Sequence, residues 1–379
     1  MSDLAIRAYV EDHVEAYLAE LTALAEHESP SRDKPRLDAL AATIAGRWAG
    51  LGGIVEIVAN PRGGDHIIAR FGRATGQRPS LVLGHFDTVW PVGTLGRMPV
   101  RREAGRLHGP GVYDMKASLV LVSAVLEALE ATERRLARPV VALFTSDEEI
   151  GSPTSRSLIE QIAAESAHVF VLEPPLADGS LKTARKGVGR FTMTVEGKAA
   201  HAGVSPEKGA SAIVELAHQI LRVQTLNDPA AGTTLNVGLI QGGTTPNVVP
   251  AHASAEIDVR AVTRAGAEKV ERALSALVAV TPGTRLSVTG GFNRPPMERT
   301  EAVAALFEQA RRVGRGLGLE LTEGSTGGGS DGNFTAALGV PTLDGLGVEG
   351  GGAHADDEHI VIDSFSARAS LLADLILEL

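Results

Sequence analysis

Apolar residues recur at helical spacing in the first fifty residues and then gather into short continuous runs. The helical periodicity covers about 4–28 and again 36–50. The short runs that follow, rich in β-branched and other apolar residues, predict three strands: IVEIVA (54–59), HIIARF (66–71) and SLVLGH (80–85).

A second group of elements follows the first strands. Residues 115–131, MKASLVLVSAVLEALEA, are apolar almost all round, which predicts a buried helix. The strand PVVALFT (139–145), a helix near 152–165 and the strand HVFVLE (168–173) come next. Helices that alternate with short, nearly all-apolar strands indicate an α/β domain whose largely parallel sheet is covered on both faces.

The pattern changes after about residue 182. Residues 187–196 alternate with period two, and a helix is predicted over 207–224. Its predicted core positions are Ile213, Leu216, Ala217 and Ile220. The strands LNVGLIQGG, HASAEIDVRA and TRLSVTGG follow, with a helix at 265–279 between the last two. This β-α-β-β-α-β order predicts a ferredoxin-like α+β unit.

The earlier pattern of helices and buried strands returns at about residue 297. It comprises a helix at 300–317, the strand VPTLDGL and a final helix at 363–379. The simplest arrangement is one α/β domain, formed by 1–182 and 297–379, that is interrupted by an inserted α+β domain at 183–296.

Composition narrows the classes of function. The chain of 379 residues is 44% apolar and 22% charged, as is typical of globular proteins with two or more domains. Its net charge of −10 argues against binding to nucleic acid or to a membrane surface. The absence of cysteine excludes disulfides, thiol catalysis and cysteine-ligated zinc. The first thirty residues lack the features of a signal peptide, and no apolar run approaches ~18 residues, so a cytoplasmic location is expected.

Polar residues follow the predicted buried strands. They are His85 and Asp87 after SLVL, the acids Asp147, Glu148 and Glu149 after VVALF, Glu173 after VFVL, and His354 after VPTLDGL, with Asp114 just before the buried helix. Because sites form outside the carboxyl ends of the strands in open α/β sheets, we expect these side chains to converge. Oxygen and nitrogen donors in a cysteine-free chain predict a site for a hard or borderline metal ion.

Each of these residues also has an ordinary explanation. A histidine after a strand is more often a loop residue than a ligand, and Asp114 after Gly-Pro-Gly could cap the helix that follows. Glu148 and Glu149 could form a solvated turn or favour the N-terminus of the next helix. The convergence of the whole set is therefore the stronger evidence.

Six segments, in order along the chain, resemble one known family. They are GHFDTVW (84–90), GPGVYDMK (109–116), TSDEEIGS (145–152), LEP (172–174), GKAAHAG (197–203) and GGGAHADDEH (350–359). They are similar to motifs of the dinuclear zinc peptidases and amidohydrolases, which include glutamate carboxypeptidase, acetylornithine deacetylase and succinyl-diaminopimelate desuccinylase. The resemblance covers essentially the whole chain. It implies a catalytic zinc domain at 1–182 and 297–379, and a lid and dimerisation domain at 183–296.

The resemblance also implies a ligand set for two zinc ions per chain, with cobalt or manganese as alternatives. The implied ligands are His85 and Glu173 for one ion, Glu149 and His354 for the other, and Asp114 as the bridge between them. Glu148 resembles the family's general base, which acts on a water that bridges the metals. Asp87 resembles the carboxylate that orients a ligating histidine, and the peptide bond after Asp114 is expected to be cis. Asp147 has no implied role.

The inserted domain supplies further candidates by the same resemblance. His201 resembles a family histidine that stabilises the oxyanion from the partner subunit, which implies a homodimer; the alternative is a loop histidine. Asn247 and Arg260 resemble residues that hold a substrate carboxylate, although Arg260 could instead form an ion pair on the strand surface. Backbone amides around Gly328 could bind the same group, and Arg294 is a weaker candidate.

The expected reaction is zinc-dependent hydrolysis of an amide or peptide bond next to a carboxylate-bearing residue. The segment TGGGSD most resembles the glutamate carboxypeptidase branch, so the expected substrate is a small peptide or N-acyl amino acid. Deacylation of N-acyl amino acids and hydrolysis of dipeptides are the alternatives. A non-catalytic binding protein is disfavoured because Glu148 is present beside the full ligand set. A dinuclear phosphoesterase is disfavoured because no phosphatase-like histidine-rich motif is found.

Overall fold

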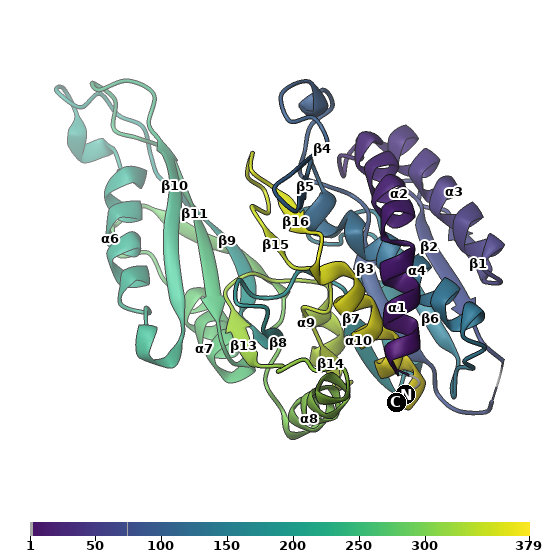
Figure 1. The fold of residues 1–379 in the computed structure, drawn as a ribbon. Helices are drawn as coiled ribbons and strands as arrows, with labels where there is room; N and C mark the ends of the chain where they lie inside the picture. The colour runs from purple at the N-terminus through teal and green to yellow at the C-terminus, as the bar shows by residue number, and fades with distance from the viewer. Residues whose placement is uncertain (1–2, 74) are drawn as a thin grey trace. The chain divides into compact units, whose positions relative to one another are not determined.

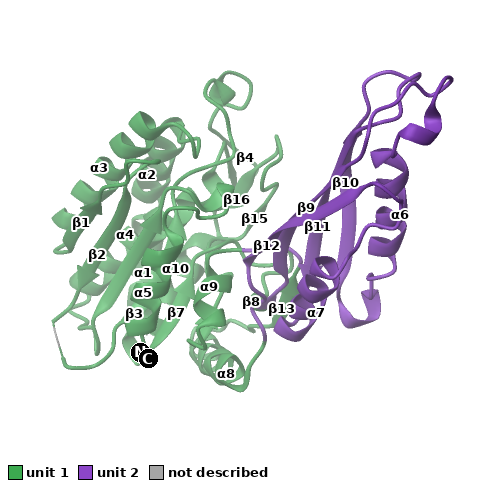
Figure 2. Ribbon diagram, turned by 180° about the vertical axis from the view of Figure 1, so that it is seen from behind, with its two compact units in different colours: residues 1–183, 299–326, 330–379 green, residues 184–298, 327–329 purple. Residues whose placement is uncertain are grey.

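The chain divides into two compact units, which Figure 2 shows in different colours. The computed structural model describes residues 3–73 and 75–379. The first unit consists of the described residues of Met1–Thr183 together with Arg299–Thr326 and Ser330–Leu379. The second unit consists of Ala184–Glu298 and Gly327–Gly329.

A six-stranded, mostly parallel sheet forms the centre of the first unit (Figure 1). In spatial order its strands are β1 (Ile54–Val58), β2 (His66–Phe71), β6 (Val140–Thr145), β3 (Ser80–His85), β7 (His168–Val171) and β14 (Thr342–Leu343). The neighbours β6, β3, β7 and β14 pair in parallel, while β2 pairs antiparallel with both β1 and β6. The expected α/β class is confirmed.

Helices cover both faces of this sheet. On one face lie α1 (Asp3–Asp12), α2 (Val14–Glu26), α3 (Lys34–Gly50), α4 (Ala117–Ala131), α8 (Glu301–Gly316) and α10 (Ser364–Glu378), and on the other lie α5 (Arg156–Glu165) and α9 (Gly332–Ala337). Strand β6 shows the alternation: Ala142 and Phe144 join the first core and Leu143 the second. Among the described residues no helix is long and apolar enough to cross a bilayer.

Two small sheets accompany the central sheet, and one of them includes the strand that leads into the second unit. One contains, in order, β15 (Gly350–Gly351), β16 (His359–Val361), β5 (Arg106–His108) and β4 (Arg101–Glu103), all antiparallel. The other pairs β13 (Glu323–Thr326) with β8 (Leu181–Arg185). The first of these sheets places the segment after β5 beside the segment before β16.

The second unit has the predicted β-α-β-β-α-β order. Its elements are β9 (Gly187–Glu196), α6 (Ala212–Gln224), β10 (Thr234–Gly242), β11 (His252–Ala261), α7 (Arg264–Ser275) and β12 (Arg285–Arg294). The sheet is antiparallel with the order β10-β11-β9-β12, so β10 and β12 are its edges. Alternate residues of the strands pack against α6 and α7 in a core of their own.

The chain enters and leaves the main segment of the second unit through two hydrogen-bonded residues. The backbone N–H of Arg185 donates to the carbonyl O of Met297 at 3.0 Å, and the N–H of Met297 donates back to Arg185 O at 3.1 Å. The two connections of the inserted unit therefore run side by side as a short antiparallel bridge.

Several predicted elements differ from the structure. The single helix predicted over 4–28 is two helices, interrupted at His13, whose ring Nδ1 lies 2.8 Å from the carbonyl O of Tyr9. The helix predicted from 207 begins only at Ala212, with Ser211 as its N-cap. Ile213, expected in the core, is 40% exposed. Only Thr342–Leu343 of the predicted strand VPTLDGL pairs in the sheet.

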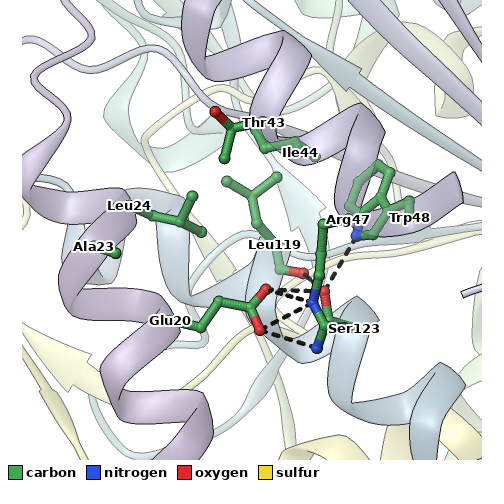
Figure 3. Close-up of a pocket in the computed structure, with 9 residues that line it drawn as sticks. All are labelled: Glu20, Ala23, Leu24, Thr43, Ile44, Arg47, Trp48, Leu119 and Ser123. Atoms are coloured by element: carbon green, nitrogen blue, oxygen red, sulfur yellow. Dashed lines mark hydrogen bonds and ion pairs between the residues drawn. The ribbon is translucent and has the colours of Figure 1, made fainter. Parts of the chain in front are cut away.

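A cavity of about 210 Å³ lies among α2, α3 and α4 (Figure 3). Its lining is Glu20, Ala23, Leu24, Thr43, Ile44, Arg47, Trp48, Leu119 and Ser123. Arg47 pairs there with Glu20 at 3.1 Å and with Glu127 at 2.7 Å, which fixes the three helices to one another. None of these helices carries a predicted site residue, so this cavity is not the candidate site.

The buried histidine of β7 makes a prediction about stability. Burial, with a contribution from Arg138, lowers the pKa of His168 to about 4, so the unfolded chain binds a proton that the folded chain resists. Stability present above pH 6.5 is therefore lost as the pH falls, by roughly 2–3 kcal/mol at pH 4.5. Denaturant unfolding at pH 7 and 4.5 should show a smaller loss for His168→Gln. Equal losses in both proteins would contradict this.

Candidate active site

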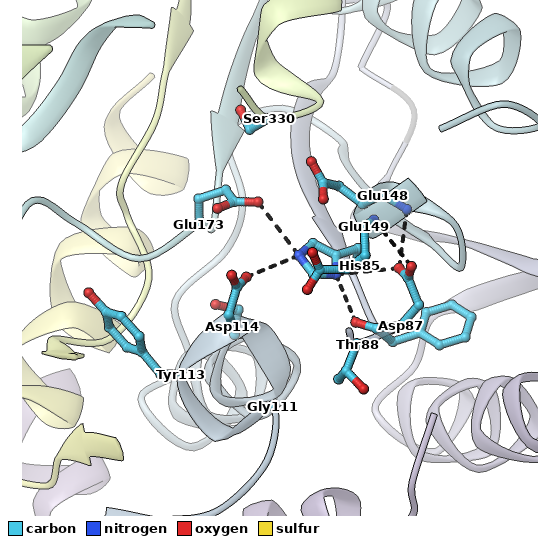
Figure 4. A network of polar contacts seen from close by, with 12 residues as sticks. His85, Asp87, Thr88, Gly111, Tyr113, Asp114, Glu148, Glu149, Glu173 and Ser330 are labelled. Carbon is cyan, nitrogen blue, oxygen red and sulfur yellow. Dashed lines mark hydrogen bonds and ion pairs between the residues drawn. The ribbon is translucent and has the colours of Figure 1, made fainter. Parts of the chain in front are cut away.

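Four of the predicted site residues lie at or just after the ends of three adjacent parallel strands. His85 is the last residue of β3, Glu148 and Glu149 lie in a 3₁₀ turn (Glu148–Ile150) just after β6, and Glu173 follows β7 by two residues. Because β6, β3 and β7 are neighbours in the sheet, their carboxyl ends meet at one edge. Figure 4 shows the resulting group of side chains.

The carboxylate of Asp114 lies between two histidines. Its Oδ1 is 3.2 Å from Nε2 of His85, and its Oδ2 is 3.3 Å from Nε2 of His354. Burial would raise the pKa of Asp114, but the hydrogen bonds of the two histidines outweigh it and hold that pKa well below its usual range. The peptide bond Asp114–Met115 is cis, as the resemblance implied.

Two further carboxylates approach the same histidines. An oxygen of Glu173 lies 3.6 Å from Nε2 of His85, and an oxygen of Glu149 lies 3.1 Å from Nε2 of His354. The donor atoms therefore form two groups, His85 with Glu173 and His354 with Glu149, which share Asp114. This is the arrangement expected if each oxygen of one aspartate faces a different metal ion.

Glu148 belongs to the same cluster. Potential ligand atoms of His85, Glu148 and Glu173 lie within 4.8 Å of one another, and so do those of His85, Asp114 and Glu149. Geometry alone thus makes Glu148 a potential ligand beside His85, as it does the predicted ligands. The division of Glu148 and Glu149 into base and ligand remains a prediction.

The electrostatics of the cluster fit a bound cation. Burial raises the pKa of Glu149 to about 7, although its bond with His354 opposes the rise. Hydrogen bonds to Asp114 and Glu149 raise the pKa of His354 to about 10, and bonds to carboxylates overcome burial and raise that of His85. The carboxylates of the cluster therefore favour the protonated forms of the two histidines. Divalent cations would supply the same compensating charge, and the oxygen and nitrogen donors suit them.

Asp87 organises the turn that carries the two glutamates. The backbone N–H groups of Glu148 and Glu149 donate to its two carboxylate oxygens, both at 3.2 Å. Nδ1 of His85 lies 3.0 Å from the backbone carbonyl O of Asp87 and 3.4 Å from its carboxylate. The carbonyl O of Asp87, an acceptor, favours a proton on Nδ1 of His85, so that Nε2 is directed at the proposed metal position.

Asp147, which had no predicted role, anchors the start of the following helical segment. Its carboxylate accepts the backbone N–H of Thr154 at 2.7 Å and the hydroxyls of Thr154 and Ser155 at 2.5 and 2.6 Å. The side chain is buried and directed at these donors. Asp147 therefore stabilises the segment that precedes α5, while the next two residues turn to the site.

Sequence reasoning missed Glu358. Its buried carboxylate accepts the backbone N–H groups of Gly111, Tyr113 and Asp114 at 2.9–3.0 Å and the indole N–H of Trp90 at 2.7 Å. Gly111 has a φ of 73°, and a Cβ there would lie 2.6 Å from Thr88 Cγ2, so this loop requires glycine. Nothing in the run DDEH distinguishes Glu358 from the two acids before it.

The second unit brings two of its predicted residues together. A β-bridge pairs His201 with Val248, and the N–H of Ala202 donates to the carbonyl O of Asn247 at 2.9 Å. His201 is exposed, and its Nδ1 accepts the N–H of Gly203 at 3.2 Å. The roles of His201 and Asn247 remain predictions.

Arg260, a predicted substrate residue, has hydrogen-bond partners inside the same unit. Arg260 forms two hydrogen bonds with Asp258, at 2.8 and 3.0 Å, and donates to Gly327 O at 3.2 Å. The ion pair that was the alternative for Arg260 is thus present. Arg185 donates to the carbonyl O atoms of Gly328 and Gly329, both at 3.3 Å, and Arg294 is buried. The substrate roles of Arg260, Gly328 and Arg294 are not decided by these contacts.

Comparison with known proteins identifies the family. The sequence model described as Peptidase family M20/M25/M40 matches residues 81–378, most of the chain. The chain belongs to this peptidase family. The M20 relatives are metallopeptidases, so the protein is a hydrolytic enzyme that uses divalent metal, and the resemblance found in the sequence is confirmed.

Individual M20 relatives show the range of similarity. The chain is 31% identical over 324 residues to carboxypeptidase G2 of a Pseudomonas species, covering 83% of this chain and 77% of that protein. It is 28% identical to the succinyl-diaminopimelate desuccinylase of Delftia acidovorans, covering 75% and 78%. The crystal structure of aminopeptidase PepT from Bacillus cereus has a TM-score of 0.79 at 23% identity, covering 96% and 98%, which supports the fold alone.

The contacts of Asp87 predict a selective loss of metal binding. In Asp87→Asn, an amide NH₂ would face one of the two backbone N–H groups, so the turn carrying Glu148 and Glu149 should shift. We expect the affinity for divalent metal to fall ~10–100-fold, measured by competition with a chelating indicator. Asp65→Asn is the control, since Asp65 pairs with Lys34 away from these ligands. Similar affinity in both variants would exclude this role for Asp87.

Proposed function

We propose that the protein is a dinuclear zinc carboxypeptidase that hydrolyses an amide or peptide bond next to a carboxylate-bearing residue. The observation that carries this proposal is the position of Asp114, whose two oxygens each face a different histidine. A shared carboxylate with a histidine and a glutamate on either side is the donor set that two co-catalytic ions require. In this proposal the ligands are His85, Asp114, Glu149, Glu173 and His354.

The proposed chemistry divides between the metals and Glu148. Two zinc ions, if held by these ligands, would lower the pKa of a bound water and polarise the scissile carbonyl. Glu148 takes the proton of that water on its carboxylate and passes it to the leaving amine. Asp87 supports this step by holding the backbone of Glu148 and Glu149 in place. His201 is proposed to stabilise the developing oxyanion.

Recognition of a substrate carboxylate is proposed for the second unit. The three hydrogen bonds of Arg260 leave N–H donors on its guanidinium, because arginine carries five. Asp258 reduces the net positive charge at this position but also fixes the direction of the guanidinium group. Asn247, Gly328 and Arg294 are proposed to contribute polar contacts to the same group.

The similarity to carboxypeptidase G2 supports the carboxypeptidase assignment over its alternatives. Similarity to a desuccinylase of Delftia acidovorans favours a second candidate, an N-acyl-amino-acid deacylase. Both reactions break an amide bond and use the same metals and base. They differ in which side of the bond carries the larger group, so a substrate panel separates them.

A panel of dipeptides, folyl-glutamate conjugates, and acetyl and succinyl amino acids tests the proposal. The zinc-loaded protein should release a C-terminal amino acid from peptide or folyl substrates, measured by chromatography. Glu148→Gln should lower kcat ~10²–10⁴-fold while keeping two zinc ions per chain, because it removes a proton acceptor and not a ligand. Glu149→Gln is the matched control and should lose metal. Near-normal turnover by Glu148→Gln would contradict the proposed role of Glu148 as the general base.

We also propose that two chains associate through the second unit. Strand β10 is an edge of its sheet and exposes Leu239 and Ile240, each at 59%, while α6 exposes Leu221 at 68%. An open edge with apolar side chains is a typical surface for pairing with a second copy. Such a dimer would allow His201 to reach the site of the partner chain, as the resemblance implies.

The exposed apolar residues predict which substitutions separate the dimer. Leu221→Asp and Ile240→Lys should each shift the protein from dimer to monomer in light scattering coupled to size exclusion, because they place charge in an apolar contact. Ile54→Asp provides the control, since Ile54 is 75% exposed on β1, an edge strand of the first unit. A wild-type monomer, or a dimer that Ile54→Asp alone disrupts, would contradict the proposed interface.

A further inference from the structure

The carboxylate of Glu358 accepts four hydrogen bonds, three from backbone N–H groups and one from an indole. Its Oε1 accepts the N–H groups of Tyr113 and Asp114, both at 3.0 Å. Its Oε2 accepts the N–H of Gly111 at 2.9 Å and the indole N–H of Trp90 at 2.7 Å. The residue is fully buried, so all four bonds form away from water.

The four donors come from the segments that carry the proposed ligands. Trp90 lies five residues beyond His85, and the three backbone donors belong to the loop that ends at Asp114. Glu358 itself lies four residues beyond His354, in the segment that leads into β16. One carboxylate therefore connects the chain segments of His85, Asp114 and His354.

The small antiparallel sheet that contains β5 and β16 positions Glu358 beside the loop that ends at Asp114. His359 of β16 pairs with His108 of β5, and the N–H of Gly109 extends that ladder to the carbonyl O of Glu358 at 3.2 Å. The loop after β5 thus begins in register with Glu358. The side chain then accepts from that loop at the residues just before and at Asp114.

A carboxylate is the side chain that these donors need. All four groups are N–H donors, and an ionised glutamate offers acceptors at both oxygens. An amide of the same size would present an NH₂ group to two of the donors in either orientation. The loop at Gly111 and Asp114 would then have to move away from the side chain.

We propose that Glu358 is a positioning residue that sets the Asp114 carboxylate between His85 and His354, so that both metal positions depend on it. The inference rests on the proposed dinuclear site. Glu358 touches neither histidine, and it acts through the backbone N–H of Asp114 and the loop before it.

The second unit contains a matched acid for comparison. Glu215 is also fully buried and accepts the N–H groups of Val280 and Thr281, at 3.0 and 2.6 Å, together with the side-chain amide of Gln219 at 2.6 Å. It contacts none of the proposed ligands. Removing its charge should cost stability in the way that removing that of Glu358 does, without a direct effect on metal binding.

The test compares Glu358→Gln with Glu215→Gln in the full chain. Both proteins are titrated with Zn²⁺ against a chelating indicator, and with Co²⁺, whose visible absorption reports the geometry of its ligands. We expect Glu358→Gln to bind Zn²⁺ ~10–100-fold more weakly and to have an altered Co²⁺ spectrum. Glu215→Gln should keep the affinity and spectrum of the wild type, with a lower Tm.

Two outcomes overturn the inference. One is a folded Glu358→Gln with wild-type affinity and spectrum, and the other is an equal change in Glu215→Gln. If Glu358→Gln does not fold, Trp90→Phe decides, since it removes one donor and keeps the ring. It should weaken Zn²⁺ binding in the same direction, and wild-type behaviour would refute the role. A wild-type protein that binds no divalent metal would instead defeat the proposed function on which this inference rests.

Discussion

Mutual repulsion among carboxylates is the constraint on which the site depends. Asp114, Glu148, Glu149 and Glu173 gather at one edge of a sheet, where burial weakens the screening of their charges by water. Such a group is stable only when positive charge lies among its members. The histidines provide some by holding protons, and divalent ions would provide more. The surrounding structure is arranged to keep these acids close despite that cost.

Three other acids carry out this arrangement without joining the cluster. Asp87 accepts the backbone of the glutamate turn, Asp147 accepts the start of the next helical segment, and Glu358 accepts the loop before Asp114. Each one accepts backbone N–H groups in charge-assisted hydrogen bonds, which are stronger than bonds between neutral groups and hold the backbone in place. The path of the backbone therefore determines the geometry of the cluster, including the positions of the proposed ligand side chains.

Local pattern was sufficient for strands that are defined by one apolar run or by one clean alternation of apolar and polar residues. Strands 66–71, 80–85 and 187–196 were predicted with the bounds that the structure has, because one apolar run or one clean alternation defines each of them. The break at His13 and the short β14 depend on contacts with other parts of the fold. No periodicity in the sequence marks either one.

The candidate site divides in the same way. His85, Asp114, Glu149, Glu173 and His354 could be grouped because they follow strands or flank a helix at one edge. Glu358 could not, since its partners are about 250 residues away in sequence and its neighbours Asp356 and Asp357 are also acids. The ion pair of Arg260 could be predicted from the sequence, because Asp258 lies two residues away on the same face of a strand.

The paired backbone of Arg185 and Met297 makes residues 186–296, the main segment of the second unit, a single excursion from the first unit. For the formation of the central sheet, the residues between Arg185 and Met297 act as one long loop. The entropic cost of closing a loop grows only slowly with its length. Large changes in the excursion would thus leave strand order and ligand positions intact. Evolution can therefore exchange or resize the second unit while the arrangement of the candidate site stays fixed.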